Sequence, residues 1–500
     1  MNFTTPLFVF FFFLVFTIRW LLPFGNSFFK KYSFLLILIF LIISSYIFYM
    51  SWNPRFAFLI LFTSFSDFYL ARKIYSSVGK RASFFLGMSI LIDLGILSYF
   101  KYCNFFLSSL KSLLYSLGLS AEIPLLEITL PAGISFYTFQ SLSYTIDVYR
   151  GLIRPEKNIL RYVLFLSFFP QLVAGPIVTA KEFLPQIKKL GFQKFRSIPL
   201  KEAIFYIFSG FIKKSIIADQ ISFIPELVYK QPGVFGFKSL LICLLAYSIQ
   251  IYGDFSGYTD IARGLALLLG FKLPENFNMP YFSSSFREFW NRWHISLSSW
   301  LKTYLYVSLG GNRVGALFTY RNLFITMLLG GIWHGANWTF VVWGAFHGLF
   351  LAIERFIIFN TEKRKNVEMV EIRELSLWQE VKRNITLKII SVLKVLFTFF
   401  LVSVLWVFFR AENFTIAAEF LGGIFSFRRG LELSYSMEKK FYLIFSFVFI
   451  SHIIGTFYKE VLERILIEPL KFRHLFFLAI LTIVVVLLSD RAKPFIYFVF

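Results

Sequence analysis

Leu329-Gly330-Gly331-Ile332-Trp333-His334-Gly335-Ala336-Asn337-Trp338 is the stretch that decides the fold, at the centre of the region 252–348. It places a histidine inside a run apolar enough to be a membrane span. Ionisable side chains are costly at membrane depth and usually face a cavity or the interior of a helix bundle. A second histidine, His294, lies about forty residues earlier, in the segment 286–298. We predict that the rest of the chain is a helical scaffold that brings these two histidines together.

The composition predicts a polytopic membrane protein. Of the 500 residues 57% are hydrophobic and 21% aromatic, with 70 phenylalanines. Apolar runs of about 17–25 residues recur along the chain, and this is the length that a helix needs to cross a bilayer. We therefore expect an all-α membrane protein with about eleven transmembrane helices plus re-entrant or interfacial helices. Spans are expected near 6–24, 33–51, 55–71, 84–103, 388–409, 441–457 and 475–489, among others.

The formal charge of +23 reflects membrane topology and does not indicate a nucleic-acid partner. Basic residues cluster in short connections between apolar runs, as the positive-inside rule describes, which places the N-terminus outside. The first apolar run has no basic segment before it and no small-residue cleavage site, so we expect an uncleaved first span. The two cysteines, Cys103 and Cys243, are predicted to be buried free thiols, too few for a cysteine metal site or a disulfide framework.

Two proline-broken segments differ from ordinary lipid-facing spans. Residues 130–141 combine apolar side chains with proline, glycine and hydroxyls, and 168–176 is interrupted again by proline. A packed inner helix or a re-entrant segment fits the first, and so does an ordinary helix with small residues at its packing face. The mixed-charge run 360–383 is expected to be a solvated connection. Without an internal repeat or a low-complexity linker, residues 1–500 are expected to form one membrane domain, with a signature core at about 130–350.

The segment Phe286–Tyr304 is predicted to be one helix at the membrane interface. Its aromatic and leucine side chains recur at three- and four-residue steps and form an apolar stripe. Beside it runs a polar stripe at steps of i, i+4, i+7 and i+11, formed by Arg287, Asn291, His294 and Ser298. His294 is thus either a functional residue in a polar row or a satisfied interfacial histidine.

His334 is the strongest candidate for chemistry. Glycines on both sides leave room for another chain or a ligand to approach closely, Trp333 and Trp338 flank the ring, and Asn337 adds a polar group. A neutral imidazole in a water-poor cavity suits a general base, because its ordinary pKa lies near working pH. A histidine that joins helices through a hydrogen bond is the competing interpretation.

The other histidines are expected to be structural. His347 lies thirteen residues after His334, which on a continuous helix is about 20 Å of rise and roughly 220° of rotation, so the two could not share a metal or a substrate atom. His452 and His474 lie in or beside late apolar spans, where we expect packing roles. No metal site is predicted, and the motifs GxSxG, HExxH and the Walker loop are absent.

The stretches 130–150, 168–176, 247–311 and 330–348 together resemble the membrane-bound O-acyltransferase (MBOAT) family. They are most similar to the subfamily that O-acetylates exported polysaccharides such as alginate, and residues 406–414 also look like it. The resemblance implies that His334 is the catalytic histidine and His294 the second polar position. It also implies a ring of helices around a central funnel or tunnel in a bacterial inner membrane.

The resemblance further implies acyl transfer without a bound cofactor. The acyl donor would be a cytoplasmic thioester, acetyl-CoA or an acyl carrier. The group would reach an extracytoplasmic polysaccharide, commonly through a separate partner acetyltransferase. His334 is expected to be the base, with His294, Asn337 and Asn291 as positioning or oxyanion groups. Further substrate contacts are expected from Arg287, Trp333 and Ser298.

Two other functions stay open. A sister subfamily D-alanylates teichoic acid from a carrier protein, although the length of this chain and its C-terminal spans favour acetyl transfer. A transporter or flippase for glycan or lipid is the non-enzymatic alternative, but the two broken segments have no counterparts in the second half of the chain.

Overall fold

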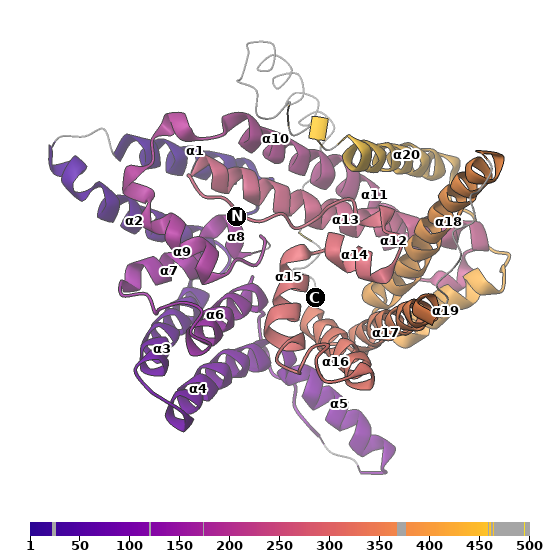
Figure 1. Ribbon diagram of the computed structural model, residues 1–500, viewed down its shortest axis with the longest axis horizontal. Helices are drawn as coiled ribbons and strands as arrows, with labels where there is room; N and C mark the ends of the chain where they lie inside the picture. Colours follow the sequence, from indigo (N-terminus) through magenta and orange to yellow (C-terminus); the bar gives the residue numbers. More distant parts are fainter. Residues whose placement is uncertain are drawn as a thin grey trace. The chain divides into compact units, whose positions relative to one another are not determined.

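A computed structural model describes residues 1–22, 27–119, 122–173, 175–367, 377–458, 460–461, 464 and 495. Throughout these residues the regular elements are helices, and β-structure is limited to one isolated bridge between Phe235 and Leu431 (Figure 1). The all-α prediction is therefore confirmed for the described part of the chain. The side chains of the charged connection 360–383 are not described, and the expected span 475–489 lies entirely outside the described residues.

Six helical segments of the described chain are long and apolar enough to cross a membrane. They are Tyr32–Met50, Lys80–Ser116, Phe237–Leu268, Trp338–Phe359, Thr386–Arg410 and Tyr435–Phe457. Two shorter apolar helices, Pro6–Leu21 and Phe414–Phe425, accompany them. The chain is thus a multi-pass membrane protein. The span expected at 84–103 is part of a continuous segment of 37 residues.

The described residues gather into two compact units. The first contains Met1–Asp219 and Gly253–Pro274, and the second contains Gln220–Tyr252 and Glu275–Glu463. The helices of the first are α1 (Pro6–Leu21), α2 (Ser27–Met50), α3 (Ala57–Tyr75), α4 (Lys80–Leu97), α5 (Cys103–Ser116), α6 (Ile134–Tyr149), α7 (Ile159–Ser167), α8 (Phe169–Leu172), α9 (Ala180–Lys188) and α10 (Leu200–Phe211). The π-helical segments η3 (Ser98–Tyr102) and η6 (Ile212–Ala218) extend α4 and α10.

The second unit contains the motifs around His294 and His334. Its helices are α12 (Phe223–Val228), α14 (Phe286–Arg292), α15 (Ile295–Trp300), the π-helical η9 (Leu301–Tyr306), α16 (Ala316–His334), α17 (Trp338–Val367), α18 (Leu377–Arg410), α19 (Phe414–Phe425) and α20 (Tyr435–Phe457). Helix α13 (Phe237–Leu268) contributes residues to both units, and α11 (Asp219–Ile221) is a single turn.

Helix starts follow from local chemistry. The side chains of Thr5, Ser285, Asn413 and Ser434 each accept a hydrogen bond from a backbone N–H in the first turn of the helix that follows. Such N-caps replace the partners that the first N–H groups of a helix lack. In α1 a proline also occupies the first turn, where its missing N–H costs nothing.

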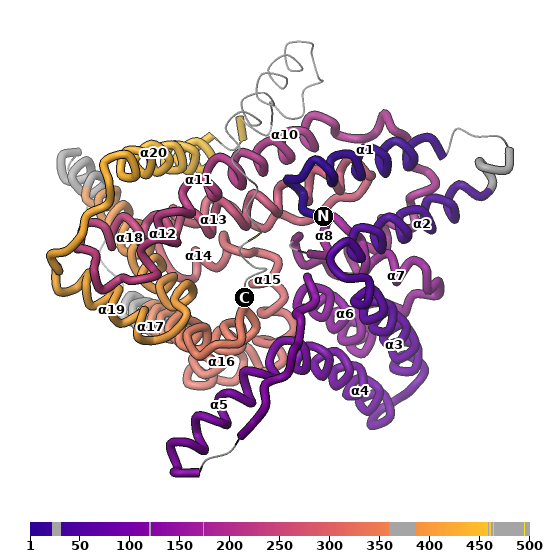
Figure 2. The backbone as a smooth tube through the Cα atoms, turned by 180° about the vertical axis from the view of Figure 1, so that it is seen from behind, coloured from indigo at the N-terminus to yellow at the C-terminus, as the bar shows by residue number. Residues whose placement is uncertain are grey.

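Helix α6 is a packed inner helix, one of the three possibilities that its hydroxyl-rich sequence left open. Its residues from Ile134 to Thr145 are all buried, and it packs against α3 and α4 (Figures 1 and 2). The hydroxyls of Ser89 and Ser141 both donate hydrogen bonds to the buried carboxyl group of Asp67. The carboxyl group of Asp67 on α3 therefore finds its partners on the neighbouring helices α4 and α6.

One buried lysine of the first unit is paired with two carboxylates. The ammonium group of Lys214 is 2.5 Å from Asp254 and 2.8 Å from Asp219, and all three side chains are buried. Removing one partner of such a group would leave an uncompensated charge.

The cysteines follow the prediction only in part, because Cys243 is buried whereas Cys103 is partly exposed.

Helices α16 and α17 form an antiparallel hairpin that positions His334. The two helices lie side by side (Figure 2). The chain turns at Gly335–Asn337, and the helices pack closely at two glycines. A Cβ atom on Gly331 would lie 2.4 Å from the backbone oxygen of Phe340 and 2.9 Å from the Cα of Gly344. The expectation that glycines beside His334 allow close approach is confirmed, and the partner is the next helix of the chain.

Gly331→Ala is expected to lower the free energy of unfolding by about 1–3 kcal/mol, the usual cost of overpacking, because backbone atoms must move to admit the methyl group. Thermal unfolding of the purified protein in detergent measures the effect. Gly422→Ala is the matched control, since a Cβ at this helical glycine meets nothing within 4 Å. Equal unfolding temperatures for the two variants would contradict the proposed packing constraint.

Candidate active site

His294 lies at a break between two short helices, and the predicted single helix over Phe286–Tyr304 is wrong. α14 ends at Arg292, α15 begins at Ile295, and His294 adopts a left-handed backbone conformation with φ 42° and ψ 54°. This conformation is uncommon for residues other than glycine and concentrates at functional sites. The side chain is fully buried, so His294 does not stand in an exposed interfacial row.

Asn276 holds the loop around His294. Its side-chain oxygen accepts hydrogen bonds from the backbone N–H of Ser296 at 3.1 Å and from the Ser296 hydroxyl at 2.9 Å. Nδ1 of His294 lies 3.2 Å from the same oxygen, and because this oxygen can only accept, Nδ1 carries the proton. Burial lowers the pKa of His294, so the ring is neutral and its lone pair is on Nε2.

His334 is the last residue of α16, and its ring lies in an aromatic enclosure. Its centroid is 5.0 Å from Trp333, 5.1 Å from Trp343 and 5.3 Å from Phe409, and the residue is 3% exposed. The ring of His294 is 6.5 Å away. The prediction that the fold brings the two histidines together is confirmed.

Asn337 has a structural role next to this enclosure. Its side-chain oxygen accepts from the backbone N–H of Thr339 at 3.1 Å, at the start of α17, and its Nδ2 donates to the carbonyl of Glu412 at 2.8 Å. The amide thus fixes the turn that follows His334. The contact that we expect between Asn337 and substrate stays a prediction.

A cavity of about 650 Å³ lies in the same unit. Three of the residues predicted to contact substrate, Arg287, Asn291 and Ser298, line it, whereas His294, Trp333, His334 and Asn337 do not. The predicted site residues therefore separate into two groups. The lining residues are Arg287, Trp290, Asn291, Ser298, Leu301, Lys302, Tyr306, Val307, Gly310, Gly311, Asn312, Arg313, Val314, Thr319, Leu323, Thr326, Met327, Leu351, Glu354, Arg355 and Ile358.

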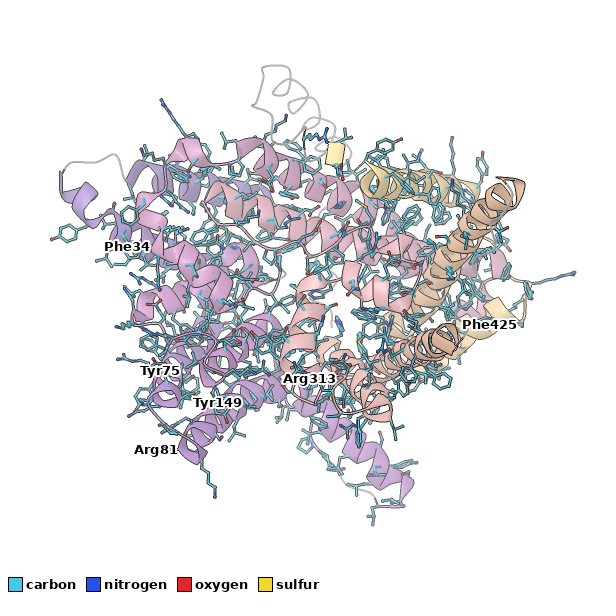
Figure 3. The ribbon with its side chains drawn as sticks, viewed as in Figure 1. Phe34, Tyr75, Arg81, Tyr149, Arg313 and Phe425 are labelled. Atoms are coloured by element: carbon cyan, nitrogen blue, oxygen red, sulfur yellow. The ribbon has the colours of Figure 1, made fainter. Side chains whose placement is uncertain are left out.

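The cavity is positively charged. Its lining contributes the four cationic side chains of Arg287, Lys302, Arg313 and Arg355 (Arg313 is labelled in Figure 3) against the single carboxylate of Glu354. Glu354 also accepts a hydrogen bond from the backbone N–H of Arg287 at 3.1 Å. Several guanidinium groups around one cavity suit a ligand with phosphate or carboxylate groups.

His347 shares a neighbouring ring, that of Trp343, with His334, so it lies closer to His334 than expected. The turn between α16 and α17 invalidates the continuous-helix estimate of its distance from His334. Its ring is 4.7 Å from that of Trp343, which also contacts His334. Its Nδ1 accepts a hydrogen bond of 3.3 Å from the indole N–H of Trp290, a residue of the cavity wall.

The remaining expectations concern packing and metals. His452 is buried among Tyr252, Tyr281 and Phe282, so its predicted packing role is confirmed, whereas His474 lies outside the described residues. Within the described part of the chain, no group of three or more His, Cys, Asp or Glu side chains could hold a metal ion.

Comparison with known proteins identifies the family. Residues 153–387 match the model of the membrane-bound O-acyltransferase family. The "Probable alginate O-acetylase AlgI" of Pseudomonas putida is 42% identical over 77% of this chain and 74% of its own length. The "Peptidoglycan O-acetyltransferase" of Helicobacter pylori is 35% identical over 77% and 73% of the two chains. The "Teichoic acid D-alanyltransferase" of Bacillus subtilis is 30% identical over 45% and 58%.

The residues matched by the family model, 153–387, include both site histidines, the cavity lining and the hairpin of α16 and α17. These similarities agree with the resemblance seen in the motifs around His294 and His334. The chain belongs to the membrane-bound O-acyltransferase family and is an acyltransferase enzyme of the membrane.

Proposed function

We propose that this enzyme moves an acetyl group from a cytoplasmic thioester, acetyl-CoA, across the membrane to hydroxyls of an exported polysaccharide. The observation that carries the proposal is the buried pair of His294 and His334, with ring centroids 6.5 Å apart. Relatives that act on alginate and peptidoglycan by name support an envelope glycan as acceptor.

In this proposal His334 is the general base. It takes the proton of the attacking hydroxyl while the oxygen forms a bond to the thioester carbonyl carbon. The tetrahedral intermediate then loses its C–S bond, and the imidazolium returns the proton to the departing thiolate. An ester and a free thiol result, and no oxidant or metal takes part. Neutral His294 lies beside this base, with ring centroids 6.5 Å apart, and is proposed to help position the substrate hydroxyl.

The cationic cavity supports coenzyme A as the donor. Coenzyme A carries a diphosphate and a 3′-phosphate, which match several cations, whereas a carrier-bound phosphopantetheine carries a single phosphodiester. Trp290 belongs both to the cavity wall and to the group of rings around His347, so the cavity adjoins the aromatic side chains near His334.

Replacing Arg313 and Arg355 together by alanine is expected to raise KM for acetyl-CoA about 10- to 100-fold and leave kcat nearly unchanged. Hydrogen bonds to charged groups contribute about 1.5–3 kcal/mol, and these two form equally in the ground and transition states. Initial rates at varied acetyl-CoA provide the test, with the exposed Arg429→Ala as control. An unchanged KM for acetyl-CoA would show that the phosphates of the donor do not bind in this cavity.

D-Alanyl transfer from a carrier protein is the second candidate, favoured by the relative in Bacillus subtilis but over less than half of this chain. The acyl group of the released ester separates the two: acetate supports our proposal, and alanine supports the sister activity.

The finer architecture belongs to the same proposal. We expect about eleven spans around a central funnel, an inner-membrane location, and an extracytoplasmic partner acetyltransferase that passes the acetyl group on. Cysteine-labelling topology and co-purification with envelope proteins test these points.

A further inference from the structure

His347 is held in a single protonation state by its neighbour. The indole N–H of Trp290 can only donate, so the hydrogen bond of 3.3 Å requires a lone pair on Nδ1 of His347. The ring is therefore neutral, and its proton is on Nε2. His452 provides a contrast: its Nδ1 lies 2.9 Å from the carbonyl oxygen of Val448, which can only accept, so there the proton is on Nδ1.

The Nε2–H group of His347 is a buried donor. The residue is 0% exposed, and Nε2 has no hydrogen-bond partner among the described residues. A buried donor left without an acceptor costs about 1–3 kcal/mol. The rings around it, those of Phe286, Phe289, Trp290 and Trp343, offer no strong acceptor. The group therefore points to an acceptor that is not part of the protein.

The position of the donor indicates what that acceptor is. Trp290 connects His347 to the wall of the cationic cavity, and Trp343 contacts both His347 and His334. The ring of His347 is thus connected through Trp290 to the cavity proposed for the thioester, and through Trp343 to the base proposed to activate the hydroxyl. In acyl transfer the atom that needs a hydrogen-bond donor is the carbonyl oxygen, which gains negative charge as the tetrahedral intermediate forms.

We propose that His347 is a third histidine of the active site, whose Nε2–H hydrogen-bonds the thioester carbonyl oxygen. The inference rests on the proposed function and deepens it. His334 moves the proton between the attacking hydroxyl and the leaving thiolate, whereas His347 keeps its own proton and stabilises the oxyanion. Trp290 is a positioning residue, because it fixes the tautomer of His347.

Three replacements of His347 test the inference in the full-length protein in native membrane vesicles, which keep any partner acetyltransferase, with acetyl-CoA as donor, isolated polysaccharide as acceptor and free thiol as the product measured. Glutamine can place an amide N–H near the former Nε2, asparagine only near Nδ1, and phenylalanine fills the volume without a donor. His347→Phe and His347→Asn are expected to lose about 100- to 1,000-fold in kcat with KM for acetyl-CoA within about twofold, as for the loss of one oxyanion donor. His347→Gln is expected to stay within about tenfold of wild type.

Equal kcat values for the glutamine, asparagine and phenylalanine variants would overturn the inference. If His347 were only structural, or only held a buried water, kcat would not depend on whether the replacement places an N–H group at the former Nε2. If the phenylalanine variant fails to fold, the glutamine and asparagine variants decide. His452→Phe is the matched control, a second buried histidine among aromatic rings, and should reduce thermal stability without lowering kcat. If His334→Ala abolishes thiol release and the His347 variants do not, only the present inference fails. If His334→Ala keeps activity, the proposed function itself fails.

Discussion

His334→Ala is expected to remove the acyl esters from the exported polysaccharide of cells in which the variant replaces the wild type. A positioned general base contributes about 10²- to 10⁴-fold to the rate, and alanine leaves nothing in the aromatic enclosure to accept the proton. Ester content is measured chemically on isolated polysaccharide at matched membrane abundance. His334→Gln, which keeps polarity and much of the volume, should be nearly as inactive.

The measurement needs a control for folding, because His334 is buried at the end of the tightly packed hairpin. His452→Gln provides it, since that residue is equally buried but packs among Tyr252, Tyr281 and Phe282. Loss of acetate only in the His334 variants places this residue at the chemistry. Loss of ester-linked alanine instead of acetate would show that the enzyme transfers D-alanyl groups. Full ester content in His334→Gln would show that the ring is not the base.

The sequence predicted those features that depend on residues close together along the chain. Long apolar runs predicted the membrane and the helices, because a bilayer accepts few other backbones. The cost of an ionisable group at membrane depth directed attention to His334, and the glycines beside it predicted a close approach, although by another chain or a ligand, whereas it is the next helix of the same chain that packs there. The proximity of His294 and His334 followed from the same reasoning and is confirmed at 6.5 Å between the rings.

Periodicity failed where long-range contacts override a helical pattern. Phe286–Tyr304 has helical spacing throughout, yet the chain breaks at His294, where the loop is held by hydrogen bonds to Asn276. The assignment of His347 to a distant position failed for the same reason, because the sequence around Gly335 did not reveal a turn. Asn276 lies in a connecting segment without any regular spacing, so no sequence signal marked it as a partner of His294.

Asn276→Ala is expected to have the second-largest effect among the substitutions at this site. Its side-chain oxygen accepts from the backbone and hydroxyl of Ser296 and from Nδ1 of His294, so alanine leaves three buried donors without their acceptor. Each such loss costs about 1–3 kcal/mol, and His294 is no longer held in one tautomer. We expect a lower unfolding temperature together with a fall in kcat of at least about tenfold. Asn413→Ala, which removes the cap of α19, is the control and should cost about 1 kcal/mol with kcat unchanged.

Asn276→Asp separates the two roles proposed for Asn276, which are to hold the loop and to keep His294 in its neutral form. Aspartate keeps the acceptor oxygen for the loop but adds a negative charge beside His294. Burial lowers the pKa of His294 in the wild type, whereas an adjacent carboxylate stabilises the imidazolium and raises this pKa. If neutral His294 is required, the variant should lose activity at neutral pH and regain it as the pH rises above the new pKa. The wild type should show no acid limb due to His294 near neutrality. A pH profile of kcat that matches the wild type at every pH would contradict a role for the neutral ring and leave Asn276 with a structural role alone.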